Sequence, residues 1–331
     1  VLTYHHIDDT TPDSTSITPA QFDTQLEFIS TQGFRVWPLS RITEALQQGD
    51  AVPENVVGLS FDDAYASVFS HAHPRLQARG WPYTVFVSTD AIDAGQAGVM
   101  TWPQLRQLAQ EGVEIGNHSQ SHAHLVVRLP GETSGQWRQR VTADIRTAQQ
   151  RLLTETGKPP VLFAYPYGEY TSELAGIIDS LGLTGFGQHS GAIGRHSDFS
   201  ALPRFPIGGN YATLERLATS LQTRPLYVVA DPPGPMVLSA AQSADRPALQ
   251  ISIEPGDYDL RALACYASGQ GKMSLTQLSK PGVFRIQPRS ALGVGRSKYN
   301  CTAPHSSRAG IYYWWSYLLM KPHEDGRWYR G

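Results

Sequence analysis

The stretch GLSFDDAY, residues 58–65, is the most informative part of the sequence, because an apolar run ends there in two adjacent carboxylates. The run Val56–Leu59 predicts a buried strand. Asp62 and Asp63 follow it directly, and two like charges at a strand end are unfavourable unless a partner compensates them. We therefore expect a cation to offset charge at this point of the fold.

Strand-like runs alternate with stretches of helical period up to about residue 225. Thr18-Pro19 with Gln21 has the pattern of a capped helix start, and an apolar stripe predicts a helix over 135–156 that stops at Gly157. Repeated strand–helix units predict a parallel sheet, and seven or so units favour a deformed (β/α) barrel. The predicted strands are 1–5, 34–37, 56–61, 83–88, 113–116, 161–165 and 183–187.

The composition changes near residue 225, and the run DPPGP at 231–235 interrupts regular structure. Downstream, short strand-like runs separated by turns predict a small all-β, sandwich-like domain. We thus expect two domains, the barrel over 1–225 and a β-sandwich accessory domain over 226–331. The run YYWWSY at 312–317 either forms an aromatic face that binds carbohydrate or packs in the core of the sandwich.

Overall composition excludes several classes of function. The 331 residues carry a net charge of about −2 without a basic stripe, so nucleic acid is not an expected partner. No apolar run reaches the roughly 20 residues that span a bilayer. We see no signal peptide, but residues 1–4 already read as strand, which suggests removal of upstream residues. We expect an exported monomer in which Cys265 and Cys301 either form a disulfide or remain two thiols.

Reactive side chains in (β/α) folds gather at the carboxyl ends of the strands. Asp62 and Asp63 follow one predicted strand, and His118 and His122 follow another. One carboxylate with two imidazoles is a sound set for catalytic Zn²⁺ with an open position, although Co²⁺ or Ni²⁺ also suits it. The sequence thus predicts a metal held by Asp63, His118 and His122, with Asp62 left to accept a proton from water.

Each of these patterns alone has a plainer explanation. Asp62 or Asp63 can cap the following helix, and an isolated HxxxH is a weak metal signal. We expect the remaining histidines of these segments to be solvated or packed, namely His71, His73 and His124. The metal interpretation depends on the combination of the segments in order, each after a strand.

This combination resembles the polysaccharide deacetylases of carbohydrate esterase family 4 over roughly residues 1–210. The motif (T/S)FDD is present as residues 60–63 and H(S/T)xxH as residues 118–122, and the opening LTYHHI is closest to the branch that acts on poly-N-acetylglucosamine. The resemblance implies that Asp62 is the catalytic base and supports the predicted metal ligands. It implies a hydrolase that removes N-acetyl groups from a glycan containing N-acetylglucosamine and releases acetate.

The third family motif, Arg-x-Pro-Tyr, departs here because Ala164 replaces the arginine that tunes the base. Arg204, in LPRFP, is the candidate to supply that charge from elsewhere. The N–H of Tyr167 is expected to stabilise an oxyanion. The family uses a late histidine to protonate the leaving amine, for which His189 is the best match and His196 the competitor.

Further residues are expected near the substrate. Trp102 either stacks on a sugar ring or packs on a helix, and Tyr4 ends the first strand and can reach the cleft; with Tyr167 and Arg204 they form the expected oxyanion and substrate contacts. Two other functions fit the same motifs. One is an O-acetyl esterase on xylan or another glycan, and the other is a non-catalytic glycan-binding protein, suggested by the arginine missing at position 164.

Overall fold

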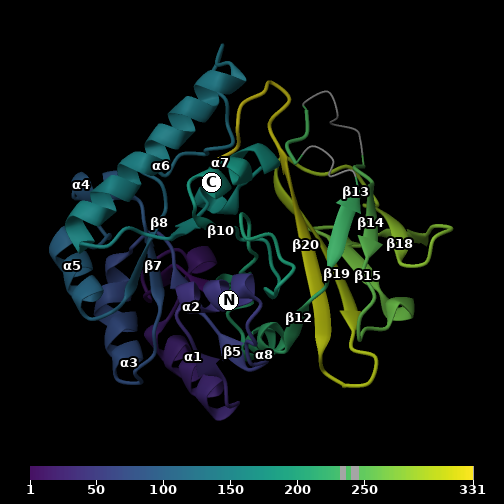
Figure 1. Ribbon diagram of the computed structural model, residues 1–331, viewed down its shortest axis with the longest axis horizontal. Coiled ribbons are helices and arrows are strands. Elements are labelled where there is room, and N and C mark those ends of the chain that lie inside the picture. The colour runs from purple at the N-terminus through teal and green to yellow at the C-terminus, as the bar shows by residue number, and fades with distance from the viewer. Residues whose placement is uncertain (232–235, 240–245, 331) are drawn as a thin grey trace. The chain divides into compact units, whose positions relative to one another are not determined.

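The computed structural model describes the chain except residues 232–235, 240–245 and 331 (Figure 1). It contains two compact units. The first consists of residues 1–188 and 198–221, and the second of residues 189–197 and 222–331. Most of the interruption predicted at 231–235 lies outside the described residues.

The first unit contains a seven-stranded parallel sheet, as the strand–helix alternation predicts. The strands are short and buried, since helices cover them. Their order is β10-β9-β8-β7-β6-β1-β11. The bounds are β1 Leu2–Tyr4, β6 Leu59–Phe61, β7 Thr84–Val87, β8 Glu114–Asn117, β9 Leu162–Ala164, β10 Thr184–Phe186 and β11 Phe205–Pro206.

Residues 199–206 curl the sheet into a deformed barrel. At one edge, Leu202 forms a parallel bridge with Phe186 of β10, and its N–H donates to the carbonyl of Gly185 at 2.8 Å. At the other edge, β11 pairs with β1. The sequence did not predict β11, because a strand of two residues is too short to show a periodic pattern of apolar residues. This segment also contains Arg204, which therefore enters the barrel.

The predicted strand at 34–37 lies outside this sheet. It is reduced to β4, Arg35–Val36, which pairs only with β5, Val56–Val57, in a two-stranded ladder. A second ladder joins β2, His6–Ile7, to β3, Ser16–Ile17. The single predicted strand 56–61 is thus divided into β5 and β6.

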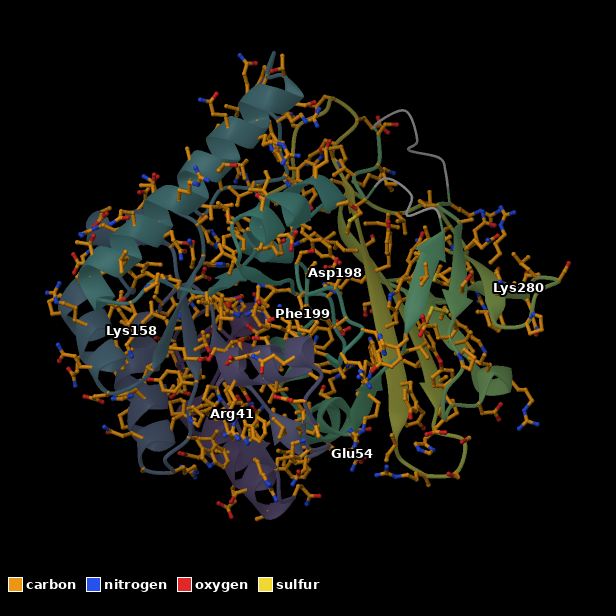
Figure 2. The ribbon with its side chains drawn as sticks, viewed as in Figure 1. Arg41, Glu54, Lys158, Asp198, Phe199 and Lys280 are labelled. Carbon is orange, nitrogen blue, oxygen red and sulfur yellow. A yellow bond between two sulfur atoms is a disulfide. The ribbon has the colours of Figure 1, made fainter. Side chains whose placement is uncertain are left out.

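Helices surround the strands of this unit, and charged side chains such as Lys158 lie on its outside (Figures 1 and 2). The capping box at Thr18 opens the first helix, as predicted, and Gly157 ends the longest one in a left-handed conformation. No helix among the described residues is long and apolar enough to cross a membrane. The helices are α1 Pro19–Thr31, α2 Leu39–Gln48, α3 His73–Gln77, α4 Thr89–Asp93, α5 Trp102–Gln110, α6 Ser134–Thr156, α7 Ser172–Ser180 and α8 Leu214–Leu221.

The second unit is built from two mainly antiparallel β-sheets, as its short strand-like runs predict. The five-stranded sheet has the order β12-β20-β19-β15-β16, and the four-stranded sheet has the order β13-β14-β18-β17. The bounds are β12 Thr223–Pro225, β13 Val228–Asp231, β14 Leu249–Ile253, β15 Ala264–Ala267, β16 Gly271–Lys272, β17 Ser274–Gln277, β18 Val283–Gln287, β19 Gly295–Pro304 and β20 Tyr312–Lys321.

A disulfide joins Cys265 of β15 to Cys301 of β19, which settles the alternative left open by the sequence. The two cysteines are directly opposed in the ladder, and both are fully buried. The aromatic run begins β20, where Trp314 donates its indole N–H to Ser316 and Trp315 stacks on Tyr317. These contacts explain the packing of part of the run within the unit.

Candidate metal centre

The turn after β6 places Asp62 and Asp63 in very different surroundings. Asp62 is completely buried, and its backbone N–H donates to the carbonyl of Tyr4 at 3.0 Å. Asp63 adopts a left-handed conformation with φ of 67°, which turns the chain abruptly out of the strand. The change of backbone direction between neighbours sends the two carboxylates to different partners.

The turn after β8 presents two imidazoles. His118 is 1% exposed, and its Nδ1 lies 2.7 Å from the carbonyl oxygen of Ala164. Because a carbonyl only accepts, Nδ1 bears a proton, which leaves Nε2 as the nitrogen that can bind a metal ion. The backbone N–H of His122 donates to Ser119 Oγ at 2.9 Å, and the N–H of Ser119 donates to Asn117 Oδ1 at 2.8 Å. These bonds fix the turn that presents His122.

Asp63, His118 and His122 come together, and their potential ligand atoms lie within 4.8 Å of one another. Asp63 Oδ1 is 3.3 Å from His118 Nε2 and 3.0 Å from His122 Nε2. One carboxylate oxygen and two imidazole nitrogens suit a divalent transition metal. The carbonyl of Ala164 supplies the outer contact that commonly orients a ligating histidine. The residues present therefore fit a metal ion.

Asp62 is paired with Arg204 rather than with the metal cluster. The guanidinium grips the carboxylate with two bonds, NH1 to Oδ1 at 2.7 Å and NH2 to Oδ2 at 2.8 Å. Gln188 Nε2 adds a third donor, 3.2 Å from Oδ2. Burial raises the pKa of Asp62, but the charges of Arg204 and His118 outweigh it, so the pKa lies below its ordinary value. Asp62 is thus an ionised, firmly oriented carboxylate.

Asp63 is also kept ionised. Burial raises the pKa of Asp63, but hydrogen bonds with His118 and His122 lower it well below the ordinary value. The hydroxyl of Tyr65 is a further partner of this carboxylate, and burial together with the charge of Asp63 raises the pKa of Tyr65. The ring of His6 stacks on Tyr65 with 3.5 Å between ring centroids. These aromatic residues form one wall beside Asp63.

The turn after β9 brings Tyr167 to the same cluster. This residue is left-handed, with φ of 60° and ψ of 6°. Its ring lies edge-on to His122 at 4.7 Å between centroids and stacks on His124 at 4.0 Å. Five non-glycine residues have positive φ in the described part of the chain, and all lie in the three motif turns: Asp63, Ala64, Ser119, His122 and Tyr167.

The structure shows what three of the predicted substrate contacts touch. Tyr4 is 0% exposed and donates to Gln25 in the core, so it has no surface for a substrate. Arg204 is likewise 0% exposed, and it pairs with Asp62, as expected of the candidate that supplies the charge in place of the motif arginine. Trp102 donates its indole N–H to Asp93 and lies under Arg151, which explains it as part of the helix surface. Tyr4 ends β1 and points towards Gln25 of α1, whereas Arg204 directly precedes β11 and points towards Asp62.

The candidate acid, His189, is 5% exposed and belongs by its contacts to the second unit. So does the competitor His196, whose ring packs against Tyr227. The role of His189 stays a prediction. Sequence reasoning missed Gln188 and Glu169, which bond Asp62 and His124; only their position in polar clusters after β9 and β10 signals them. The expectation that His73 and His124 are packed is confirmed, since His73 contacts Tyr83 and Glu111.

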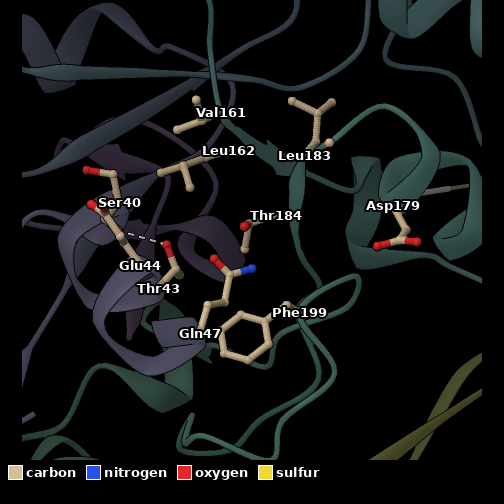
Figure 3. Close-up of a pocket in the computed structure, with 11 residues that line it drawn as sticks. Ser40, Thr43, Glu44, Gln47, Val161, Leu162, Asp179, Leu183, Thr184 and Phe199 are labelled. Carbon is tan, nitrogen blue, oxygen red and sulfur yellow. Dashed lines mark hydrogen bonds between the residues drawn. The ribbon is translucent and has the colours of Figure 1, made fainter. Parts of the chain in front are cut away.

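A cavity of about 440 Å³ lies elsewhere in the first unit (Figure 3). Its lining includes Leu162 and Thr184, the first residues of β9 and β10, and side chains of α2 such as Thr43 and Glu44. It is therefore at the amino ends of the strands, whereas the metal cluster follows their carboxyl ends. It has no imidazole, and we do not assign the chemistry to it.

Comparison with known proteins identifies relatives of the first unit. A family described as polysaccharide deacetylase matches residues 49–186, which include both the aspartate and histidine motifs. Poly-beta-1,6-N-acetyl-D-glucosamine N-deacetylase of Escherichia coli K12 is 25% identical over 244 residues, covering 63% of this chain and 36% of the relative. The protein of the same name from Staphylococcus aureus MRSA252 is 21% identical and covers 58% of this chain and 68% of its own. The chain thus spans about a third of the Escherichia coli relative.

Solved structures show the same fold at low identity. The Streptococcus pyogenes deacetylase PplD, in complex with acetate, superposes with a TM-score of 0.59 at 23% identity, covering 66% of this chain and 96% of that one. IcaB from Ammonifex degensii gives a TM-score of 0.58 at 23% identity, covering 67% and 95%. The likeness covers about two thirds of this chain and almost all of each of those two chains.

Proposed function

We propose that this chain, as a member of the polysaccharide deacetylase family, is a metal-dependent hydrolase that removes N-acetyl groups from a glycan containing N-acetylglucosamine. The observation that carries the proposal is the convergence of Asp63, His118 and His122 beside the buried pair of Asp62 and Arg204. A metal site and a separate ionised carboxylate are the two parts that acetamide hydrolysis by water requires.

Asp63, His118 and His122 would hold the ion, which we propose to be Zn²⁺, with Co²⁺ and Ni²⁺ as ions that suit the same donors. A bound Zn²⁺ lowers the pKa of water towards 7 and polarises a carbonyl oxygen. The Ala164 carbonyl holds His118 in the tautomer that metal binding needs. The site therefore has its ligands preformed.

Asp62 is proposed to accept the proton of the attacking water. A base must be ionised and oriented. The charge of Arg204 keeps Asp62 ionised, and the hydrogen bonds from Arg204 and Gln188 orient its carboxylate. Arg204 supplies the charge contact that the family obtains from the arginine replaced here by Ala164. Arg204 reaches Asp62 from the residue before β11, whereas Ala164 is in β9, so the missing motif arginine does not argue against activity.

Tyr167 and His189 complete the proposed set. The backbone N–H of Tyr167 is proposed to donate to the oxygen that becomes negatively charged as the acetamide is attacked. His189 is proposed to protonate the departing amine, since an amine leaves poorly without a proton. The products are acetate and a free amino sugar.

The substrate and location are extensions of this proposal. The two relatives named for poly-beta-1,6-N-acetyl-D-glucosamine support that polymer as the first substrate to test. The disulfide between Cys265 and Cys301 supports export, since such bonds persist in oxidising compartments. We propose that residues 226–331 form an accessory domain that binds the glycan, with aromatic side chains such as exposed Tyr312 as contacts.

Acetate release from four substrates tests the function: poly-β-1,6-N-acetylglucosamine, chitin oligomers, peptidoglycan and acetylxylan. We expect release from an N-acetylated polymer, and release only from acetylxylan would favour the O-acetyl esterase. Bound metal without acetate from any substrate would favour a non-catalytic binding protein.

The Asp62→Asn variant tests the base. It should keep its metal and lose deacetylation by about 100-fold to 10,000-fold, because the amide cannot take up the proton. The matched control is Asp23→Asn, which alters another aspartate–arginine pair of the same unit, with Arg75 at 2.9 Å. An Asp62→Asn enzyme as active as this control would contradict the assignment of the base.

A further inference from the structure

Tyr167 occupies a conformation that needs support from its neighbours. A left-handed tyrosine is unfavourable because its Cβ crowds the following carbonyl. Such conformations persist only where the surrounding structure over-determines them. The question is which side chains hold Tyr167, since its N–H direction depends on this turn.

One side of the Tyr167 ring is covered by His124. The two rings are nearly parallel, with an interplanar angle of 18° and 4.0 Å between centroids. His124 is itself anchored, because its Nδ1 lies 2.8 Å from Glu169 Oε2. The side chain of Glu169 is 0% exposed and that of His124 is 20% exposed, so water competes little for this bond.

Glu169 belongs to the same turn as Tyr167, and its backbone N–H donates to the carbonyl of Pro166 at 3.1 Å. Glu169 therefore bonds His124, and His124 lies against the ring of Tyr167, which belongs to the same turn as Glu169. A buried carboxylate is costly unless it is bonded, which fixes the position of this side chain strongly. We call the Glu169–His124 pair, packed against the ring of Tyr167, the brace.

The other side of the turn is equally constrained. Gly168 packs so closely that an added Cβ would lie 2.5 Å from Gln188 Cβ and 2.7 Å from Gln188 N. Gln188 in turn donates to Asp62 at 3.2 Å. The turn is thus fixed between the residue that bonds the candidate base and the rings of His122 and His124.

We propose that the Glu169–His124 pair is a positioning device for Tyr167, holding its backbone N–H in the direction needed to stabilise an oxyanion. This inference rests on the proposed function of the site. It assigns to His124 and Glu169 a role in acetamide hydrolysis that requires neither to touch substrate, metal or water. The device depends on the hydrogen bond and the stacked rings, not on a change of charge.

Steady-state kinetics of His124→Ala test the proposal. We expect kcat on the N-acetylated substrate to fall by about 10-fold to 100-fold, since small misplacements of a catalytic group cost about that much, with KM and metal affinity changed less than about twofold. The matched control is His73→Ala, which removes another buried histidine paired with a glutamate, Glu111 at 2.8 Å. A kcat equal to that of the control, or a metal affinity that falls as much as kcat, would overturn the proposal.

Conservative and double variants separate positioning from general damage. Glu169→Gln should retain most of the wild-type kcat, because its amide oxygen still accepts from His124, whereas Glu169→Ala should resemble His124→Ala. The double variant Glu169→Ala/His124→Ala should be no slower than either single variant, because both belong to one brace. Additive losses would contradict this.

Amide hydrogen exchange of residues 165–170 gives a readout that does not need activity. Exchange at Tyr167 should accelerate in His124→Ala and stay unchanged in His73→Ala. Unaltered exchange in His124→Ala overturns the brace. Should the wild-type protein release no acetate from any substrate, the proposed function fails, while exchange still decides whether His124 holds the turn.

Discussion

The turns at the amino ends and at the carboxyl ends of the barrel strands both contain left-handed backbone positions, but different residues occupy them. Where helices return to strands, left-handed positions are occupied by glycine, as at Gly157 after α6 with φ of 75°. Where strands β6, β8 and β9 end, left-handed positions are occupied by residues such as Asp63, His122 and Tyr167, with Gly168 as the one glycine of these motif turns. Glycine adopts this conformation without strain, whereas each of the others costs about 1–3 kcal/mol.

The difference indicates what each end is organised for. Several strained residues represent a sizeable fraction of the roughly 5–15 kcal/mol that stabilises a typical domain. That strain is retained only where chemistry needs a side chain at that position. Under the proposed function, the amino ends of the strands serve stability and the carboxyl ends serve the reaction.

Partly buried carboxylates at the two ends show the same contrast. At the amino end, Glu114 accepts from the N–H of Leu39 at 2.9 Å and from Thr84 Oγ1 at 2.7 Å, so its charge is compensated by donors of the fold. At the carboxyl end, Asp63 faces the Nε2 atoms of His118 and His122. Hydroxyl and amide donors complete a helix cap, but two imidazoles can instead share a cation with the carboxylate.

Removing an imidazole from the candidate metal site should have the largest effect of the proposed substitutions. In His118→Ala we expect metal affinity to fall by more than about 1,000-fold, because losing a ligand exceeds the roughly 10–100-fold cost of losing an outer partner. Acetate release should fall to background. Competition titration with a chelator measures affinity, and His73→Ala is the control. Tight, stoichiometric binding by His118→Ala would show that the ion is held elsewhere.

Arg204→Met should produce the next largest effect, on stability. The change leaves the Asp62 carboxylate buried without its cation, which we expect to cost about 3–5 kcal/mol in the free energy of unfolding. Replacing both partners, as in Asp62→Leu/Arg204→Met, should recover most of this loss. Arg75→Met removes a partly exposed pair with Asp23 and should cost about 0–1 kcal/mol. Urea unfolding at pH 7 compares the four proteins, and equal losses in both single variants would contradict the argument.

Much of the fold was predictable because it depends on local, repeated signals. Short stretches of sequence predict the alternation of strands and helices, the capping box at Thr18 and the helix end at Gly157. The metal cluster was predictable for a topological reason, since parallel strands bring their carboxyl ends to one edge. Two motifs 55 residues apart, at Asp63 and His118, therefore meet.

The sequence alone did not predict most of the side-chain contacts of the site residues. The pair of Asp62 and Arg204 spans 142 positions and was expected only through the family resemblance, because two-residue β11 gives no pattern that predicts it. Tyr4 was expected at the cleft because it ends a strand, but side chains alternate in direction, and this one points to Gln25 in the core. Direction at a strand end depends on register, which a single sequence does not fix.

The smallest expected effect tests the contrast in backbone conformation itself. Ala64 has φ of 51° and is fully buried. Changing Ala64 to glycine relieves about 1–2 kcal/mol of left-handed strain but removes a buried methyl worth about 0.8 kcal/mol and adds about 0.5–1 kcal/mol of chain entropy. We therefore expect stability within about 1 kcal/mol of wild type in urea unfolding.

The reverse change, Gly157→Ala, places a side chain where φ is 75° in open space, with no heavy atom within 4 Å of the new Cβ. Nothing offsets the backbone strain there, so this variant should lose about 1–2 kcal/mol. The asymmetry between the two substitutions is the sharpest form of the comparison. An Ala64→Gly protein that loses as much stability as Gly157→Ala would mean that the motif turn is no more strained than an ordinary helix end, so that its backbone would not mark a functional site.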